Sequence, residues 1–184
     1  LTKSPSAIGY MLQKDHLFEW RNIFSNISLG LEIQKRLDEP ARQELLEMMA
    51  AYGLAGFEYA KPSELSGGMR QRAALIRTLA LKPDLLLLDE PFSALDYQTR
   101  LSVCDDISSI IRQTHKTAIL VTHDLSEAIS VADRILVLSP RPGRVKKILS
   151  IDFPENCIRS LDRRNCPEFS TYFNMVWKEL KTYE

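Results

Sequence analysis

The sequence lacks any long apolar stretch and any excess of charge of one sign. None of its apolar runs approaches the roughly 20 residues that a membrane-spanning helix needs, and no signal peptide is recognisable. Its 24 basic residues balance its 24 acidic residues. Domains that bind nucleic acids usually carry a basic patch, so a nucleic acid is disfavoured as the main ligand.

Cysteine and glycine are also scarce. The three cysteines, Cys104, Cys157 and Cys166, form no Cys-x-x-Cys pair, and we expect three free thiols in a reducing compartment. Only seven glycines occur, and none precedes a lysine. What is present suffices for one globular domain, because 184 residues with a 45% apolar fraction can form a core. The chain begins with Leu1 rather than Met, and we expect it to be the C-terminal part of a longer protein.

The chemically most informative stretch is Leu65–Asp96. Ser66–Gly68 opens a predicted helix, and a glycine pair at a helix start exposes backbone N–H groups to which a phosphate can bind. The apolar run Leu85–Leu88 ends in two carboxylates, Asp89 and Glu90, which places negative charge where a metal–phosphate complex could bind. Together these features indicate a protein that handles a nucleoside triphosphate.

Apolar runs alternate with predicted helices in the second half of the chain. Runs that are apolar on both faces and alternate with helices predict a parallel sheet. Because parallel strands end at one edge of a sheet, Asp89, Glu90 and His123 should lie at the same edge. The predicted strands are Leu85–Leu88, Ala118–Val121 and Ile135–Leu138, and the helices are Tyr97–Gln113 and one that opens at Asp124.

Two further groups of residues have more than one interpretation. Ile8–Leu12 is predicted to be a buried strand ending at Gln13, and the apolar residues Leu17, Phe18 and Trp20 follow it. These three residues either pack beneath the loop or form a docking surface for a partner. The arginines Arg70, Arg72 and Arg77 either face solvent or contact a phosphate or an acidic partner.

Five motifs, in this order and spacing, resemble those of ATP-binding-cassette (ABC) ATPases. Gln13 matches the Q-loop glutamine, and LSGGMRQR (Leu65–Arg72) resembles the signature motif. LLLLDEP (Leu85–Pro91) resembles the Walker B motif, SALD (Ser93–Asp96) resembles the D-loop, and His123 in VTHD resembles the switch histidine.

Further details resemble one subfamily of importers. DEPFSALD and SPRPGR (Ser139–Arg144) are similar to the ATPases that drive uptake of nitrate, sulfonate, taurine and related small substrates. The implied fold is α/β, with a P-loop NTPase-like (RecA-like) parallel sheet core and an α-helical signature subdomain, its first strands and phosphate loop missing. The implied domains are the end of the N-terminal core portion (1–13), the helical signature subdomain (14–82), the RecA-like core (83–152) and a C-terminal helical extension (153–184).

The resemblance also implies an ATPase that uses ATP and Mg²⁺, with a role for each motif residue. Glu90 would be the general base. Asp89 would hold Mg²⁺, partly through water, with Gln13 as a second group near the cation. His123 would contact the γ-phosphate. The remaining nucleotide-binding residues would act across a dimer interface and are Ser66, Gly67, Gly68, Gln71 and Asp96.

The implied partners are other subunits of a transporter. A second ATPase subunit would pair head to tail with the first, and transmembrane permease subunits would contact the region after Gln13. A substrate-binding protein would take part indirectly, and no nucleic acid is expected. The implied location is peripheral, on the cytoplasmic face of the cell membrane.

One family motif, the phosphate-binding loop G-x-x-x-x-G-K-[ST], is absent. In the family it lies upstream of the Q-loop, so we expect it to precede Leu1. The 184-residue chain alone should then bind ATP poorly and should not hydrolyse it. Two alternatives stay open, a degenerate or regulatory cassette half and an ABC ATPase without a transport role. Intact Asp89, Glu90 and His123 argue against the degenerate cassette.

Overall fold

The computed structural model describes residues 8–181, and the chain folds as two units, Leu1–Val121 and Thr122–Glu184. The first unit contains β1 (Ile8–Met11), α1 (Ile23–Ile33), α2 (Glu39–Ala51), the short 3-10 helix η1 (Pro62–Glu64), α3 (Gly67–Leu79), β2 (Leu85–Asp89), α4 (Tyr97–Gln113) and β3 (Thr117–Val121). The second contains α5 (Leu125–Val131), β4 (Arg134–Leu138), β5 (Val145–Ser150), α6 (Ser160–Asn165) and α7 (Pro167–Lys181). No helix within residues 8–181 combines the length and apolar character needed to cross a bilayer.

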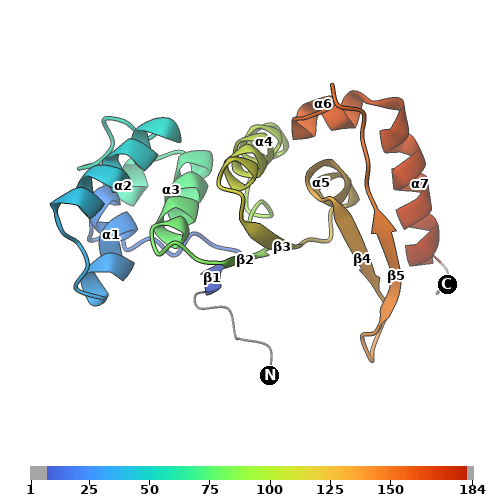
Figure 1. Ribbon diagram of the computed structural model, residues 1–184, viewed down its shortest axis with the longest axis horizontal. Helices are drawn as coiled ribbons and strands as arrows, with labels where there is room; N and C mark the ends of the chain where they lie inside the picture. The colour runs from blue at the N-terminus through green and yellow to red at the C-terminus, as the bar shows by residue number, and fades with distance from the viewer. Residues whose placement is uncertain (1–7, 182–184) are drawn as a thin grey trace. The chain divides into compact units, whose positions relative to one another are not determined.

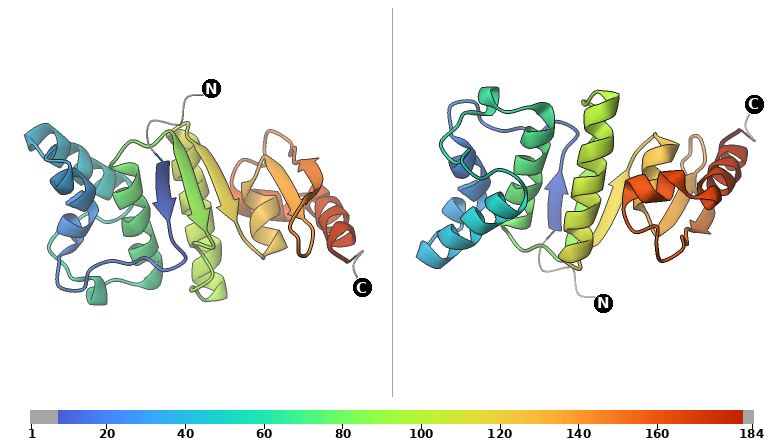
Figure 2. Two further views of the ribbon diagram at one scale, coloured as in Figure 1. Left: turned by 90° about the horizontal axis from the view of Figure 1, so that it is seen from below. Right: turned by 90° about the horizontal axis from the view of Figure 1, so that it is seen from above.

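The first unit is built on a parallel sheet with the strand order β1-β2-β3. Figure 2 shows α3 and α4 on one side of this sheet. On that side β1 approaches α3 closely, because a Cβ atom on Gly9 would lie 2.6 Å from the Thr78 side chain. The parallel pairing of β2 with β3 is as the sequence predicts.

β1 differs from its prediction as a buried strand. Its residues alternate, with Met11 buried toward the helices while Ile8 and Tyr10 are about half exposed on the opposite face. The difference arises because only one face of the sheet is covered within the described part of the chain.

The helices α1, α2 and α3 of the first unit pack together (Figure 1). Asn22 caps α1 by accepting a hydrogen bond from Ser25, and Asp38 caps α2 by accepting one from Ala41. Such side chains satisfy backbone N–H donors at a helix start. The buried core between these helices includes Leu17, Ile23, Ile27, Leu31, Leu45, Met49, Leu54 and Ile76.

The second unit contains a β-hairpin rather than a third parallel strand. β4 pairs antiparallel with β5, so the prediction that Ile135–Leu138 extends the parallel sheet is wrong for the described residues. The Pro140–Gly143 turn places β5 beside β4. β4 therefore pairs with the strand next to it in sequence and not with the parallel sheet. The boundary between the two units, at Val121/Thr122, falls inside the segment 83–152, whose assignment to one core domain stays a prediction.

The C-terminal region differs from prediction in two respects. α6 was not predicted, because it is short and polar, but its Arg163 is buried and donates hydrogen bonds to the carbonyls of Ser130 and Ala132 at the end of α5. The expectation of free thiols is wrong for Cys157 and Cys166, which form a disulfide. They lie nine residues apart on either side of α6, a spacing that a search for Cys-x-x-Cys pairs does not detect.

Candidate functional site

Three polar side chains meet where β1 and β2 end. The Gln13 amide nitrogen Nε2 donates hydrogen bonds to Glu90 Oε2 and to Ser93 Oγ, both at 3.1 Å. The Ser93 hydroxyl in turn donates to the Glu90 carbonyl at 3.0 Å. Parallel strands bring these residues to one edge, although 77 positions separate Gln13 from Glu90. Gln13 and Glu90, predicted separately from two motifs, therefore contact each other.

Glu90 has an unusual backbone conformation. Its φ is +43°, in the left-handed region that non-glycine residues rarely occupy. Its N–H donates to the Val121 carbonyl at 2.9 Å, which ties the turn after β2 to the end of β3. Strain of this kind costs on the order of 1–3 kcal/mol and is concentrated at functional sites. Four other non-glycine residues within residues 8–181 also have a positive φ, so the conformation supports the motif assignment of Glu90 but does not identify the site alone.

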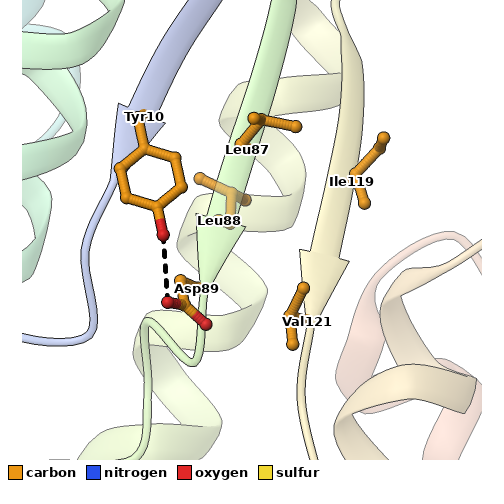
Figure 3. Close-up of a pocket in the computed structure, with 6 residues that line it drawn as sticks. All are labelled: Tyr10, Leu87, Leu88, Asp89, Ile119 and Val121. Atoms are coloured by element: carbon orange, nitrogen blue, oxygen red, sulfur yellow. Dashed lines mark hydrogen bonds between the residues drawn. The ribbon is translucent and has the colours of Figure 1, made fainter. Parts of the chain in front are cut away.

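Asp89 ends β2 beside a cavity of about 290 Å³. Figure 3 shows the Tyr10 ring reaching from β1 toward the Asp89 carboxylate, with Ile119 and Val121 lining the cavity from β3. The Tyr10 hydroxyl donates to Asp89 Oδ2 at 3.1 Å, and this hydrogen bond raises the pKa of Tyr10. Sequence reasoning identified Asp89 but missed Tyr10.

The Ser66–Gly68 turn starts α3 as predicted. The Ser66 hydroxyl accepts a hydrogen bond from the N–H of Met69 and so caps the helix. Gly68 is buried, and a Cβ atom there would lie 2.7 Å from a Val103 methyl group on α4. Gly68 thus has a packing role besides the predicted phosphate contact. Gln71 is only 3% exposed, and its Oε1 has no hydrogen-bond partner within residues 8–181.

Asp96 lies after β2 in the first unit, whereas His123 lies after β3 at the start of the second unit. Asp96 caps α4, and hydrogen bonds from the backbone and hydroxyl of Thr99 lower its pKa. His123 is exposed and lies just before α5, which Asp124 caps by accepting hydrogen bonds from two backbone N–H groups. Since Asp89 and Glu90 belong to the first unit and His123 to the second, their convergence at one edge stays a prediction.

Arginines of α3 hold the segment that follows Gln13. Arg70 forms two hydrogen bonds with the Asp15 carboxylate, at 2.8 and 3.1 Å, and Arg77 donates to the backbone carbonyls of Asp15 and His16. These two arginines therefore bind their own chain. On the same segment Trp20 is 74% exposed, and its ring centroid lies 4.7 Å from that of Phe18.

The donor atoms near the end of β2 suit a magnesium ion that arrives with a nucleotide. Residues 8–181 contain no cluster of three or more His, Cys, Asp or Glu side chains that could bind a metal ion. The Asp89 carboxylate and the Gln13 amide offer the hard oxygen ligands that Mg²⁺ prefers, and this ion usually completes its shell with water and phosphate oxygens. The residues present thus fit Mg²⁺ as a companion of phosphate groups.

Comparison with known proteins gives the family. The sequence profile described as ABC transporter matches residues 1–93. The uncharacterized ABC transporter ATP-binding protein YtlC of Bacillus subtilis is 48% identical over 177 residues, which cover 96% of this chain and 68% of that protein. The chain belongs to the ABC transporter family. The family resemblance of the five motifs is thereby confirmed.

Other ABC proteins agree with this assignment. The taurine import ATP-binding protein TauB of Yersinia pestis is 45% identical over 150 residues, 81% of this chain and 59% of that protein. The dimeric ATP-binding cassette MJ0796, solved in a post-hydrolysis state with ADP and Pi, has a TM-score of 0.63 and 30% identity. The match covers 80% of this chain and 64% of that one, and it confirms the predicted P-loop NTPase-like α/β fold. The chain spans 68% of the length of YtlC and 59% of the length of TauB.

Proposed function

We propose that the full-length protein is the ATP-hydrolysing subunit of an ABC importer for nitrate, a sulfonate, taurine or a related small substrate. The observation that supports this most directly is the contact of Gln13 with Glu90 and Ser93 at the carboxyl end of β2. Membership of the ABC family and the similarity to a taurine import protein support the same assignment.

Glu90 is the proposed general base. Gln13 donates to one oxygen of its carboxylate, which orients the carboxylate, and the strained backbone fixes where the side chain leaves the chain. A positioned carboxylate can accept a proton from an attacking water, a contribution of about 10²–10⁴-fold to the rate. His123, after β3, is proposed to contact the γ-phosphate and hold that water in line.

Asp89 is the proposed ligand of Mg²⁺, partly through water, and Gln13 is a second group near the cation. When bound, Mg²⁺ neutralises charge on the phosphate oxygens. The N-terminus of α3, formed by Ser66, Gly67 and Gly68, is proposed to bind phosphate of an ATP held by a second subunit. Gln71 and Asp96 are proposed to bind the nucleotide at the same interface between subunits.

The proposed partners are a second cassette, as in the dimeric MJ0796 structure, and the transmembrane subunits of the importer. The exposed Trp20 and its neighbour Phe18 offer an apolar surface to such a subunit just after Gln13. A substrate-binding protein would act through those subunits. The proposed location of the protein is peripheral, on the cytoplasmic face of the membrane.

ATP turnover and ATP binding by the full-length protein and its Glu90→Gln variant test the enzymatic part of the proposal. We expect turnover to fall by at least about 100-fold while ATP binding persists, because the amide cannot accept the proton. Glu47→Gln, on the exposed surface of α2, is the matched control and should retain wild-type turnover. The 184-residue chain alone, which has no phosphate-binding loop, should be silent.

Two outcomes would contradict the proposal. Full turnover by Glu90→Gln would remove Glu90 as the base. A full-length protein that stays silent even with its membrane partners would favour a regulatory cassette half. The substrate class is tested separately. Loss of the protein should abolish growth on nitrate as nitrogen source, or on taurine or an alkanesulfonate as sulfur source, but not growth on ammonium and cysteine.

A further inference from the structure

Tyr10 and Asp89 form a hydrogen bond that connects two strands. The Tyr10 hydroxyl donates to Asp89 Oδ2 at 3.1 Å, although 79 positions separate the two residues. The register explains the contact, because Tyr10 lies opposite Leu87, and Asp89 follows two residues later on the same face of the sheet. Diagonal neighbours of this kind are within reach of an aromatic side chain.

The Tyr10 hydroxyl is the polar group that contacts the Asp89 carboxylate within an otherwise apolar cavity lining. The other side chains that line the cavity are apolar, namely Leu87, Leu88, Ile119 and Val121. Within residues 8–181, no other side chain donates a hydrogen bond to Asp89. A tyrosine combines an apolar ring, which packs along the sheet, with a polar tip that can hold a carboxylate.

We propose that Tyr10 is a positioning residue for the divalent cation that accompanies the nucleotide, because its hydroxyl fixes the orientation of the Asp89 carboxylate. The inference rests on the proposed function, in which Asp89 is the cation ligand. A hydrogen bond to one carboxylate oxygen restricts rotation of the group, so the second oxygen meets a cation in fewer orientations. Partners that orient a metal ligand in this way are typically worth 10–100-fold in metal affinity.

The test measures cation affinity directly. Mn²⁺, whose unbound form is quantified by electron paramagnetic resonance, is titrated into the full-length protein with a non-hydrolysable ATP analogue. We expect Tyr10→Phe to weaken Mn²⁺ binding by about tenfold, and Asp89→Asn to weaken it further. Affinity for the analogue in EDTA should be the same in Tyr10→Phe and wild type, because the ring is retained. Tyr59→Phe, at an exposed tyrosine outside this site, is the matched control and should bind Mn²⁺ like the wild type.

The outcomes separate this inference from the proposed function. If Asp89→Asn loses Mn²⁺ while Tyr10→Phe binds it as tightly as the wild type, Tyr10 has no positioning role and the role of Asp89 stands. If Tyr10→Phe also loses the analogue in EDTA, the tyrosine supports the fold and the inference is overturned. If Asp89→Asn binds Mn²⁺ like the wild type, the proposed cation role of Asp89 fails, and the inference fails with it.

Discussion

At the level of single residues, Asp15 fixes the segment after Gln13 against α3. Its carboxylate accepts two hydrogen bonds from Arg70 and one from the backbone N–H of Leu17. Burial opposes ionisation of this carboxyl group, but the hydrogen bonds outweigh burial and lower the pKa of Asp15. A carboxyl group whose pKa is lower in the folded state stabilises the fold above its unfolded-state pKa of about 4. That stabilisation is lost as the pH falls through the folded-state pKa.

We therefore expect Asp15→Asn to lower the free energy of unfolding at about pH 7 by about 1–2 kcal/mol, a modest value because the ion pair is only partly buried. At about pH 3 the deficit should shrink, since the wild-type carboxyl group is becoming neutral as well. Urea unfolding at the two pH values measures both quantities. Glu19→Gln, which removes the more exposed carboxylate on the same arginine, should change stability little. An equal deficit for Asp15→Asn at both pH values would contradict this explanation.

The backbone of Glu90 allows a second prediction for a single residue. Glycine is normally less favourable than alanine, but at a φ of +43° the order should reverse, because glycine adopts this conformation without strain. We expect Glu90→Gly to be more stable than Glu90→Ala by about 1 kcal/mol. Thermal unfolding of the two variants measures the difference, and both lack the side chain, so the lost contact with Gln13 cancels. A more stable alanine variant would show that the turn relaxes out of the left-handed region.

Sequence reasoning located some site residues and missed others for a physical reason. Gln13 and Glu90 stand in recognisable motifs, so their roles could be predicted before their contact was known. Tyr10 and Ser93 contribute through hydrogen bonds to residues about 80 positions away. Those contacts depend on the register between strands, which a local pattern does not specify.

At the level of elements, Gly68 allows α3 to lie against α4. A methyl group at this position would come within 2.7 Å of Val103 and 3.2 Å of Thr99, both on α4. Since Val103 is buried, it cannot simply move away. The glycine therefore serves the packing of two helices, besides its proposed part in phosphate binding.

We expect Gly68→Ala to lower the free energy of unfolding by about 1–3 kcal/mol through overpacking. Val103→Ala should restore part of this loss in the double variant, because it removes the atoms that clash. A double-mutant cycle from urea unfolding measures the coupling. Gly143→Ala is the control, since no atom lies within 4 Å of the added methyl group. Additive losses for Gly68→Ala and Val103→Ala would show that the two positions do not compete for space.

Elements with strong end signals were predicted well, and those without them were not. Asp124 marked the start of α5, and the apolar run before Asp89 marked the end of β2. α6 has six residues and a polar sequence, and it depends on the buried Arg163 for its contact with α5. Such an element is stabilised by tertiary contacts, which sequence periodicity does not record.

At the level of the whole molecule, the pairing of strands was the least predictable feature. A run of alternating strands and helices predicts one parallel sheet, and β1, β2 and β3 form it. β4 has the same apolar character, yet it pairs with β5 because a connection of only six residues, 139–144, brings that strand alongside. Apolar composition thus predicted correctly that β4 is a strand. It did not predict which strand β4 pairs with, because a strand close in sequence competes with more distant ones.

The uncovered face of the parallel sheet leads to a prediction for the 184-residue chain. Ile8, Tyr10, Ile119 and Val121 are each about half exposed on this face, opposite the side that α3 and α4 cover. Contiguous exposed apolar side chains bind hydrophobic dyes and favour association, whereas isolated ones do not. We expect the chain to increase the fluorescence of such a dye, and the double variant Ile119→Thr/Val121→Thr to lose most of that signal.

A variant at an isolated apolar position shows whether the dye binds this face of the sheet specifically. Ile33 is 73% exposed at the end of α1, away from the sheet, so Ile33→Thr removes a similar apolar area without changing this face. Its dye fluorescence should equal that of the wild type. If Ile33→Thr and the double variant reduce the signal equally, the dye reports exposed apolar area in general, and the sheet face has no special part in it. If only the double variant does so, the face of β1, β2 and β3 is an apolar surface that is open to a covering partner.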